Sequence, residues 1–181
     1  MQKVALIFSF ILASLNCHAQ NKIPSVDEIL KPVYAQAAKE NKKVLLIFHA
    51  SWCGWCRKMD TSLQDKNIQP LINEYYVTTH LTVYESKDKK QLENLGALEF
   101  LTKHGGAEKG IPYWLVLDKH GNVLADSQYK PNQNVGCPAT EEEVAHFISV
   151  LKKTSSLNDD QLKVVEKRFR MNEAKKIDPQ L

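Results

Sequence analysis

Two cysteines only two residues apart, Cys53 and Cys56, stand between a segment that favours a strand and one that favours a helix. The apolar run 44–48 is typical of a buried strand, and Met59 and Leu63 have the spacing of a helix's inner face. A thiol at a helix start lies beside unpaired backbone N–H groups and the positive dipole end, which favour its thiolate. We therefore expect Cys53 at an exposed helix start and Cys56 one turn further in, within reach of a disulfide. This arrangement predicts a dithiol that exchanges disulfides.

The bulk composition is that of one soluble domain and gives no sign of a nucleic-acid or membrane partner. The chain has 181 residues, of which 43% are hydrophobic and 25% charged. Its formal net charge is +3 and the basic residues are scattered, so neither nucleic acid nor a membrane surface is expected as a partner. No nucleotide- or flavin-binding fingerprint occurs in the sequence, and we expect no cofactor and no metal.

The first nineteen residues have the pattern of an export signal. Lys3 precedes an almost wholly apolar run over 4–15, and Ala19 precedes the expected cut. We therefore predict a signal peptide over 1–19 and a periplasmic or secreted mature protein. A buried N-terminal helix and a lipid anchor on Cys17 are the alternatives.

After the signal, strands alternate with helices, which predicts an α/β fold with a central mixed sheet flanked by helices. Pro32 interrupts the first helical pattern, so we expect the main helix to begin there. Residues 128–139 are expected to be a polar loop. The other expected elements are a strand at 44–49, a short helix within 65–72, a strand at 75–83, two short helices split near Gly96, a hairpin of 113–118 with 123–126, a helix after Thr140, and an extra C-terminal helix at 159–171.

Two stretches together resemble the thioredoxin superfamily. The stretch 51–59, Ser-Trp-Cys-Gly-Trp-Cys-Arg-Lys-Met, resembles its active-site segment, and 110–118, Gly-Ile-Pro-Tyr-Trp-Leu-Val-Leu-Asp, followed by Gly121, resembles its cis-proline loop and hairpin. The chain is similar to exported bacterial members with a Cys-Gly-Trp-Cys centre and to the soluble module of transmembrane disulfide reductases. The resemblance covers about 30–152. We accordingly expect a single thioredoxin-like domain over 20–172 and a frayed tail over 173–181.

The resemblance implies the role of each cysteine. Cys53 would be the attacking thiol and Cys56 the resolving thiol of a redox-active disulfide. Thioredoxins often carry a buried acid six residues before the first cysteine to deprotonate the second, but here Ile47 stands at that position. The proton acceptor is therefore open: it could be water, His49 or a carboxylate from elsewhere in the chain.

The resemblance also implies a substrate-binding surface. Pro112 would be the cis-proline that faces the cysteines, and the backbone of Ile111 would pair with a substrate segment as an added strand. Trp52 and Trp55 would form an apolar lip around the dithiol.

The expected function is an exported thiol–disulfide oxidoreductase that takes part in cell redox homeostasis. The apolar Ile111 before Pro112 is typical of reductant-type relatives, so we expect reduction of protein disulfides. Because an exported protein meets an oxidising compartment, a reductase would need a membrane-bound electron donor besides its disulfide-containing clients. The sequence does not determine the oligomeric state, and we expect a monomer.

Several alternatives stay open at this point. The pair could be a mainly structural disulfide in a thioredoxin-fold binding or chaperone module, which predicts resistance to mild reductant where the redox hypothesis predicts an exposed, easily reduced pair. The protein could also donate disulfides as an oxidant. A metal site would need additional ligands such as His49 and Cys137, and haem attachment would need a histidine where Arg57 stands.

Cys137 is either an incidental, partly buried thiol or an intermolecular or third redox thiol. His80 is interpreted as a surface or strand-face residue.

Overall fold

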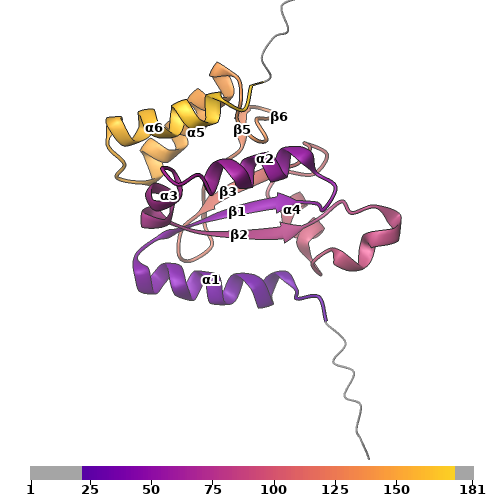
Figure 1. Cartoon of the computed structure of the whole chain (residues 1–181). Coiled ribbons are helices and arrows are strands. Elements are labelled where there is room, and N and C mark those ends of the chain that lie inside the picture. The colour runs from indigo at the N-terminus through magenta and orange to yellow at the C-terminus, as the bar shows by residue number, and fades with distance from the viewer. Residues whose placement is uncertain (1–21, 174–181) are drawn as a thin grey trace, which may run out of the picture.

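A four-stranded mixed sheet forms the centre of the protein, in a computed structural model that describes residues 22–173 (Figure 1). The strand order is β2-β1-β3-β4. Strand β1 (Lys43–His49) pairs in parallel with β2 (Tyr76–Thr82) and antiparallel with β3 (Tyr113–Leu117), which continues antiparallel into β4 (Val123–Asp126). The mixed sheet and the hairpin predicted from the sequence are confirmed.

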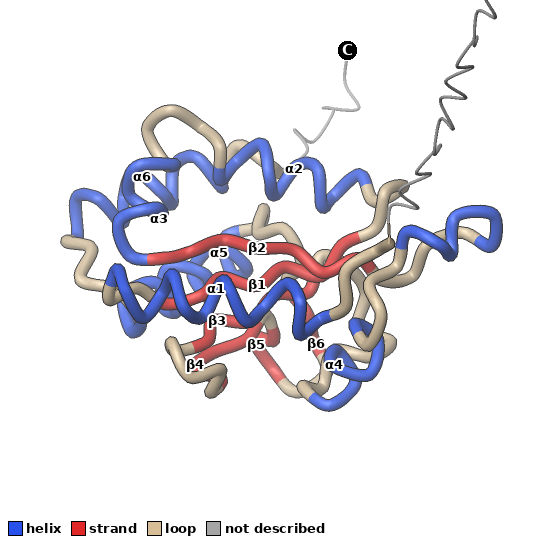
Figure 2. The backbone as a smooth tube through the Cα atoms, turned by 90° about the horizontal axis from the view of Figure 1, so that it is seen from below, coloured by secondary structure: helices blue, strands red, loops and turns tan. Residues whose placement is uncertain are grey.

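Helices cover both faces of this sheet. Helices α1 and α4 pack on one face, and α2, α3, α5 and α6 pack on the other. In Figure 2, which looks from below, α1 lies in front of the sheet. The helices are α1 (Val26–Glu40), α2 (Gly54–Leu63), α3 (Gln69–Tyr75), the short 3₁₀ helix η1 (Lys87–Leu92), α4 (Ala97–Lys103), α5 (Glu141–Thr154) and α6 (Asp159–Arg170).

Strand β1 separates two hydrophobic cores. Val44, Leu46 and Phe48 belong to the core under α1, whereas Leu45 and Ile47 belong to the core under α2, α3, α5 and α6. A strand that is covered on both faces needs apolar side chains at every position, which is why this segment of the sequence is a continuous apolar run rather than an alternating one. Its carboxyl end leads directly into the cysteine segment.

Three helices begin with a capping box. The pairs are Ser25 with Glu28 at α1, Thr140 with Glu143 at α5, and Asn158 with Gln161 at α6. In each pair the cap side chain accepts from the N3 backbone, and the N3 side chain accepts from the cap backbone, so two otherwise unpaired N–H groups are satisfied. All three starts follow from patterns visible in the sequence.

Two expectations about local structure were wrong. Pro32 does not start the main helix but lies inside the continuous helix α1. Its ring is on the exposed face, and the capping box at Ser25 already fixes the first turn, so the helix tolerates one missing N–H.

The stretch 128–139, expected to be a loop, contains a two-stranded sheet. Strand β5 (Gln128–Lys130) pairs antiparallel with β6 (Gln133–Asn134), and Asn132 supplies the left-handed turn residue with φ 66°. Because these strands are short and their side chains polar, the sequence shows no hydrophobic alternation there. Buried Val135 and Cys137 anchor the end of this segment in the core.

The predicted signal peptide over 1–19, the lipid-anchor alternative at Cys17, and residues 174–181 of the predicted tail lie outside the described residues. Within 22–173, no helix is both long enough and apolar enough to span a membrane.

Candidate functional site

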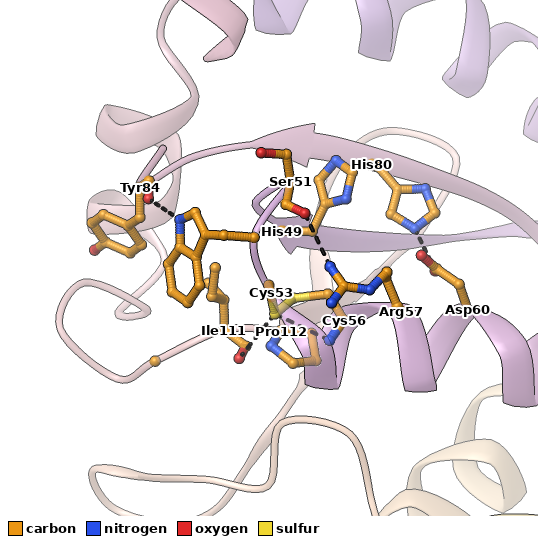
Figure 3. The surroundings of a disulfide bond; sticks show 12 residues. His49, Ser51, Cys53, Cys56, Arg57, Asp60, His80, Tyr84, Ile111 and Pro112 are labelled. Carbon is orange, nitrogen blue, oxygen red and sulfur yellow. Dashed lines mark hydrogen bonds and ion pairs between the residues drawn. A yellow bond between two sulfur atoms is a disulfide. The ribbon is translucent and has the colours of Figure 1, made fainter. Parts of the chain in front are cut away.

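Helix α2 begins at the cysteine pair. Cys53 is its N-cap residue, and the Cys56 backbone N–H donates to Cys53 Sγ at 3.0 Å. The two residues form a disulfide, with 1.97 Å between the Sγ atoms and 5.3 Å between the Cα atoms (Figure 3). The placement at the strand-to-helix junction agrees with the sequence analysis. The N–H contact and the helix N-terminus both favour negative charge on Cys53 once the disulfide is reduced.

The disulfide is buried, which corrects the expectation of an exposed Cys53. Cys53 and Cys56 are each 2% exposed. Ile111 packs against the small cluster formed by Ala50, Cys53 and Cys56, and the Ile111 carbonyl oxygen lies 3.6 Å from Cys53 Sγ. The sequence could not show this cover, because it comes from a loop 58 residues further along the chain.

The covering loop contains a cis peptide bond between Ile111 and Pro112, as expected. Pro112 and Ile111 lie directly at the disulfide in Figure 3. Beside them is a groove of about 270 Å³, lined among others by Trp55, Ile111, Pro112 and Asn134. The structure thus brings Trp55, Ile111 and Pro112 of the predicted substrate surface together.

The two tryptophans that flank Cys53 and Cys56 in the sequence, Trp52 and Trp55, are exposed, and each makes one contact with a polar group. Trp52 is 56% exposed and its Nε1–H donates to the Tyr84 carbonyl at 2.7 Å. Trp55 is 49% exposed, with the Lys58 ammonium 4.4 Å from its ring centroid. Large aromatic surfaces beside a disulfide can contact a polypeptide with little loss of side-chain freedom. The contact with Tyr84 directs Trp52 toward the segment after β2, whereas Trp55 borders the groove.

A buried carboxylate that the sequence analysis missed holds the segment before the cysteines. Glu85 is 4% exposed, and it accepts bonds from the Ser51 backbone N–H at 2.5 Å and from Ser51 Oγ at 2.8 Å. Arg57 donates from Nη1 to the Ser51 carbonyl at 3.0 Å. The available signal was the alternation of Leu81 and Val83, both buried, which Glu85 continues with the strand period of two.

Two histidines lie beneath α2. The ring centroids of His49 and His80 are 4.8 Å apart, and His80 Nε2 lies 2.8 Å from Asp60 Oδ1. Burial, and secondarily the neighbouring His80, lower the pKa of His49 from its ordinary value of 6.5. The buried residue six positions before Cys53 is Ile47, so strand β1 brings no carboxylate to that position.

Cys137 is buried at 4% exposure, and Asn172 Nδ2 lies 3.4 Å from its sulfur. Burial raises the pKa of the Cys137 thiol to about 12, which favours the interpretation as an unreactive thiol. Across residues 22–173, no cluster of three or more histidine, cysteine or acidic side chains could hold a metal ion.

Comparison with known proteins places these features in a family context. A family model described as a thioredoxin-like domain matches residues 30–134. No curated protein matches the chain.

Solved structures give further similarities. A disulphide isomerase from Xylella fastidiosa Temecula1 is 21% identical, with a TM-score of 0.48, covering 80% of this chain and 88% of that one. A thioredoxin from Thermus thermophilus is 17% identical, with a TM-score of 0.45, covering 72% and 85% respectively. A protein described as a DsbH oxidoreductase is 20% identical, with a TM-score of 0.42, covering 83% and 95%.

Proposed function

We infer the function from one premise: the chain belongs to the thioredoxin-like domain family. Its fold is the thioredoxin-like α/β fold that the two sequence motifs indicated, with a mixed sheet between helices and a C-terminal helix. We propose that the protein is a thiol–disulfide oxidoreductase that reduces protein disulfides through Cys53 and Cys56.

The observation that carries this proposal is the disulfide at the N-terminus of α2, opposite a cis Ile111–Pro112 bond. In the reduced state, the Cys56 N–H and the helix end stabilise a Cys53 thiolate, and the thiolate is the nucleophile. Trp55, Ile111 and Pro112 border the adjacent groove, in which an extended client segment can lie against the loop backbone.

The proposed reaction has two exchange steps. The Cys53 thiolate attacks one sulfur of the client disulfide, forms a mixed disulfide and releases the first client thiolate. Cys56 loses its proton and attacks Cys53 Sγ, which forms the Cys53–Cys56 disulfide and releases the second client thiolate. Each client sulfur takes a proton from water. The client gains two electrons, and the enzyme dithiol loses two.

Location, direction and partners form the finer part of the proposal. The signal pattern over 1–19 supports export to the periplasm or beyond. The apolar Ile111 before Pro112 supports the reducing direction. A protein that reduces disulfides in an oxidising compartment needs re-reduction, so we propose a membrane-bound protein as its electron donor and disulfide-containing proteins as its clients.

The decisive experiment measures the reduction potential of the Cys53–Cys56 pair and the rate of insulin disulfide reduction with dithiothreitol as electron source. We expect a potential near about −270 mV, as in thioredoxin, and loss of insulin reduction in Cys53→Ser. Cys56→Ser should instead accumulate mixed disulfides with insulin. A potential near about −120 mV would reverse the direction and make the protein a disulfide donor.

The burial of the pair favours a second candidate, a binding or chaperone module whose disulfide is structural. Only 2% of each cysteine is exposed, and Ile111 packs over the pair, which hinders the approach of a reductant. This candidate predicts that millimolar dithiothreitol leaves the disulfide intact in the folded protein. It also predicts that both cysteine-to-serine variants lose stability without any loss of a redox activity.

A further inference from the structure

The second exchange step poses a problem of proton transfer. Cys56 is buried, and burial disfavours its thiolate. The buried Ile47 offers no acceptor for its proton. The Cys56 backbone N–H is already directed at Cys53 Sγ, so it stabilises the first thiol rather than the second.

The register of β1 and β2 indicates which side chain of the sheet lies at the same height as Cys56 along the strand direction. Ile47 is the Cα partner of His80, and His80 contacts Asp60, so this level of the sheet faces Asp60 on α2. Helix α2 runs back over the sheet in the direction opposite to β1 (Figure 1). One turn from Asp60 toward the helix start, about 5.4 Å, leads to Cys56. Two residues from Ile47 along the strand, about 6.6 Å, lead to His49, whose side chain is on the same face of the sheet. The two displacements are nearly equal, so His49 lies at the level of Cys56.

We propose that His49 accepts the proton of Cys56 during the resolving step, and that His80 and Asp60 are positioning residues that hold and polarise His49. This inference rests on the proposed oxidoreductase function.

The neighbours of His49 orient its ring. His49 Nε2 lies 3.2 Å from Thr82 Oγ1, and the tilted ring of His80 packs beside it, with 4.8 Å between the ring centroids and 48° between the ring planes. Among the described residues, Nε2 is the ring nitrogen with a hydrogen-bond partner, which leaves Nδ1 for the exchange with Cys56. In Figure 3 the two imidazoles lie next to each other on the side of the disulfide where Arg57 and Asp60 leave α2.

The charges around His49 suit a proton acceptor. The groups that face it are His80 from β2, Arg57 and Asp60 from α2, and Glu85 from the segment after β2. Burial and His80 lower the pKa of His49, so the imidazole is neutral at neutral pH and can accept a proton. Asp60 and Glu85 act in the opposite direction and stabilise the imidazolium after the transfer.

In the step itself, the Cys56 S–H bond breaks and the proton moves to His49 Nδ1. The Cys56 electron pair forms the bond to Cys53 Sγ, and the electron pair of the mixed disulfide leaves on the client sulfur. His49 then loses its proton to water. No oxidant beyond the client disulfide is needed.

The experiment mixes the reduced protein with 5,5′-dithiobis(2-nitrobenzoate) over a range of pH and follows thionitrobenzoate release. The first release reports attack by Cys53, and the second reports resolution by Cys56. In the wild type, the second rate should rise with pH through an inflection below 6.5, where His49 becomes neutral. His49→Leu should lose this inflection and slow the second release about tenfold at neutral pH, equivalent to one pKa unit of the thiol. Its first release should be unchanged.

Two further variants complete the test. His120→Leu changes a histidine on an exposed turn and should keep both rates and the inflection. Asp60→Asn removes a carboxylate that raises the pKa of His49, so its inflection should move to lower pH; this holds the test even where His49→Leu does not fold. An unshifted inflection in Asp60→Asn, or a second rate within twofold of wild type in folded His49→Leu, overturns the proposal. Absence of any second release from wild type instead overturns the oxidoreductase function.

Discussion

The side-chain amide of Asn134 donates to the Pro112 carbonyl at 3.0 Å and so joins strand β6 to the loop that covers the disulfide. The same Nδ2 lies 3.2 Å from the Lys109 carbonyl and 3.1 Å from the Gly110 carbonyl, while Oδ1 accepts from the Gly136 backbone N–H. One short polar side chain therefore shares its two N–H donors among three carbonyls of the loop. The small sheet of β5 and β6 supports the wall of the candidate site.

Asn134→Ala should loosen this loop. The carbonyls of Lys109, Gly110 and Pro112 lose their shared donor, so we expect a loss of about 1–2 kcal/mol in the free energy of unfolding. The KM for a protein disulfide should rise, because the loop borders the groove in which the client segment lies. Urea unfolding and insulin reduction measure both effects. Asn67→Ala, at an exposed position, serves as the control, and equal behaviour of the two variants would contradict this role of the Asn134 side chain.

Gly106→Ala should destabilise the protein by crowding the core. A Cβ at this position would collide with the Leu101 side chain and lie 2.8 Å from Tyr113 Cδ1, and both side chains are fully buried. Such overpacking costs about 1–3 kcal/mol. Gly54→Ala is the matched change, because the nearest atom to its Cβ would be the end of the Arg57 side chain at 3.8 Å. Equal urea midpoints for the two variants would contradict the prediction, because they would mean that Leu101 and Tyr113 move aside without loss of stability.

The sequence predicted those parts of the fold that are decided within a few residues. The capping boxes beginning at Ser25, Thr140 and Asn158 each involve residues three apart, and the apolar run of β1 reflects burial on both faces. The cysteine pair at the helix start was also predictable, because its spacing and its flanking strand and helix are local features.

Contacts between distant segments could not be predicted in this way. The bond from Ser51 to Glu85 spans 34 residues, and the contact between Asp60 and His80 spans 20. The burial of Cys53 depends on Ile111, which also lies far along the chain. From the sequence alone, His80 was interpreted as a surface or strand-face residue and Glu85 was not singled out, so the residues that support the site were missed.

Asn172→Ala should reveal how the end of the described chain is tied to the core. Asn172 is 4% exposed, exchanges bonds with Ser62 Oγ at 3.0 and 3.2 Å, and donates to the Pro138 carbonyl at 3.1 Å. Removal of the Asn172 amide leaves the buried Pro138 carbonyl without this donor, so the free energy of unfolding should fall by about 2 kcal/mol. The neighbouring Glu173→Ala breaks only an exposed ion pair with Arg170 and should change it by less than about 1 kcal/mol. Urea unfolding compares the two, and a smaller effect at Asn172 would refute the tie.

Cys137 should resist alkylation in the folded protein. Because burial raises the pKa of its thiol from 9.0 to about 12, its thiolate fraction at pH 9 is about 500-fold below that of an ordinary cysteine. Iodoacetamide at this pH, with peptide mapping to locate the label, should modify Cys137 only after unfolding in urea.

The same shift fixes the sign of a pH effect on stability. Between about pH 9 and about pH 12, the unfolded chain has lost the Cys137 proton while the folded protein keeps it. Fewer protons are then bound in the unfolded state, so the contribution of this thiol makes stability fall as the pH rises. The fall should be smaller in Cys137→Ala, which has no thiol to ionise, when urea midpoints are compared across this range. Rapid labelling of folded wild type at pH 9 would instead show an accessible thiolate and return Cys137 to the list of candidate redox thiols.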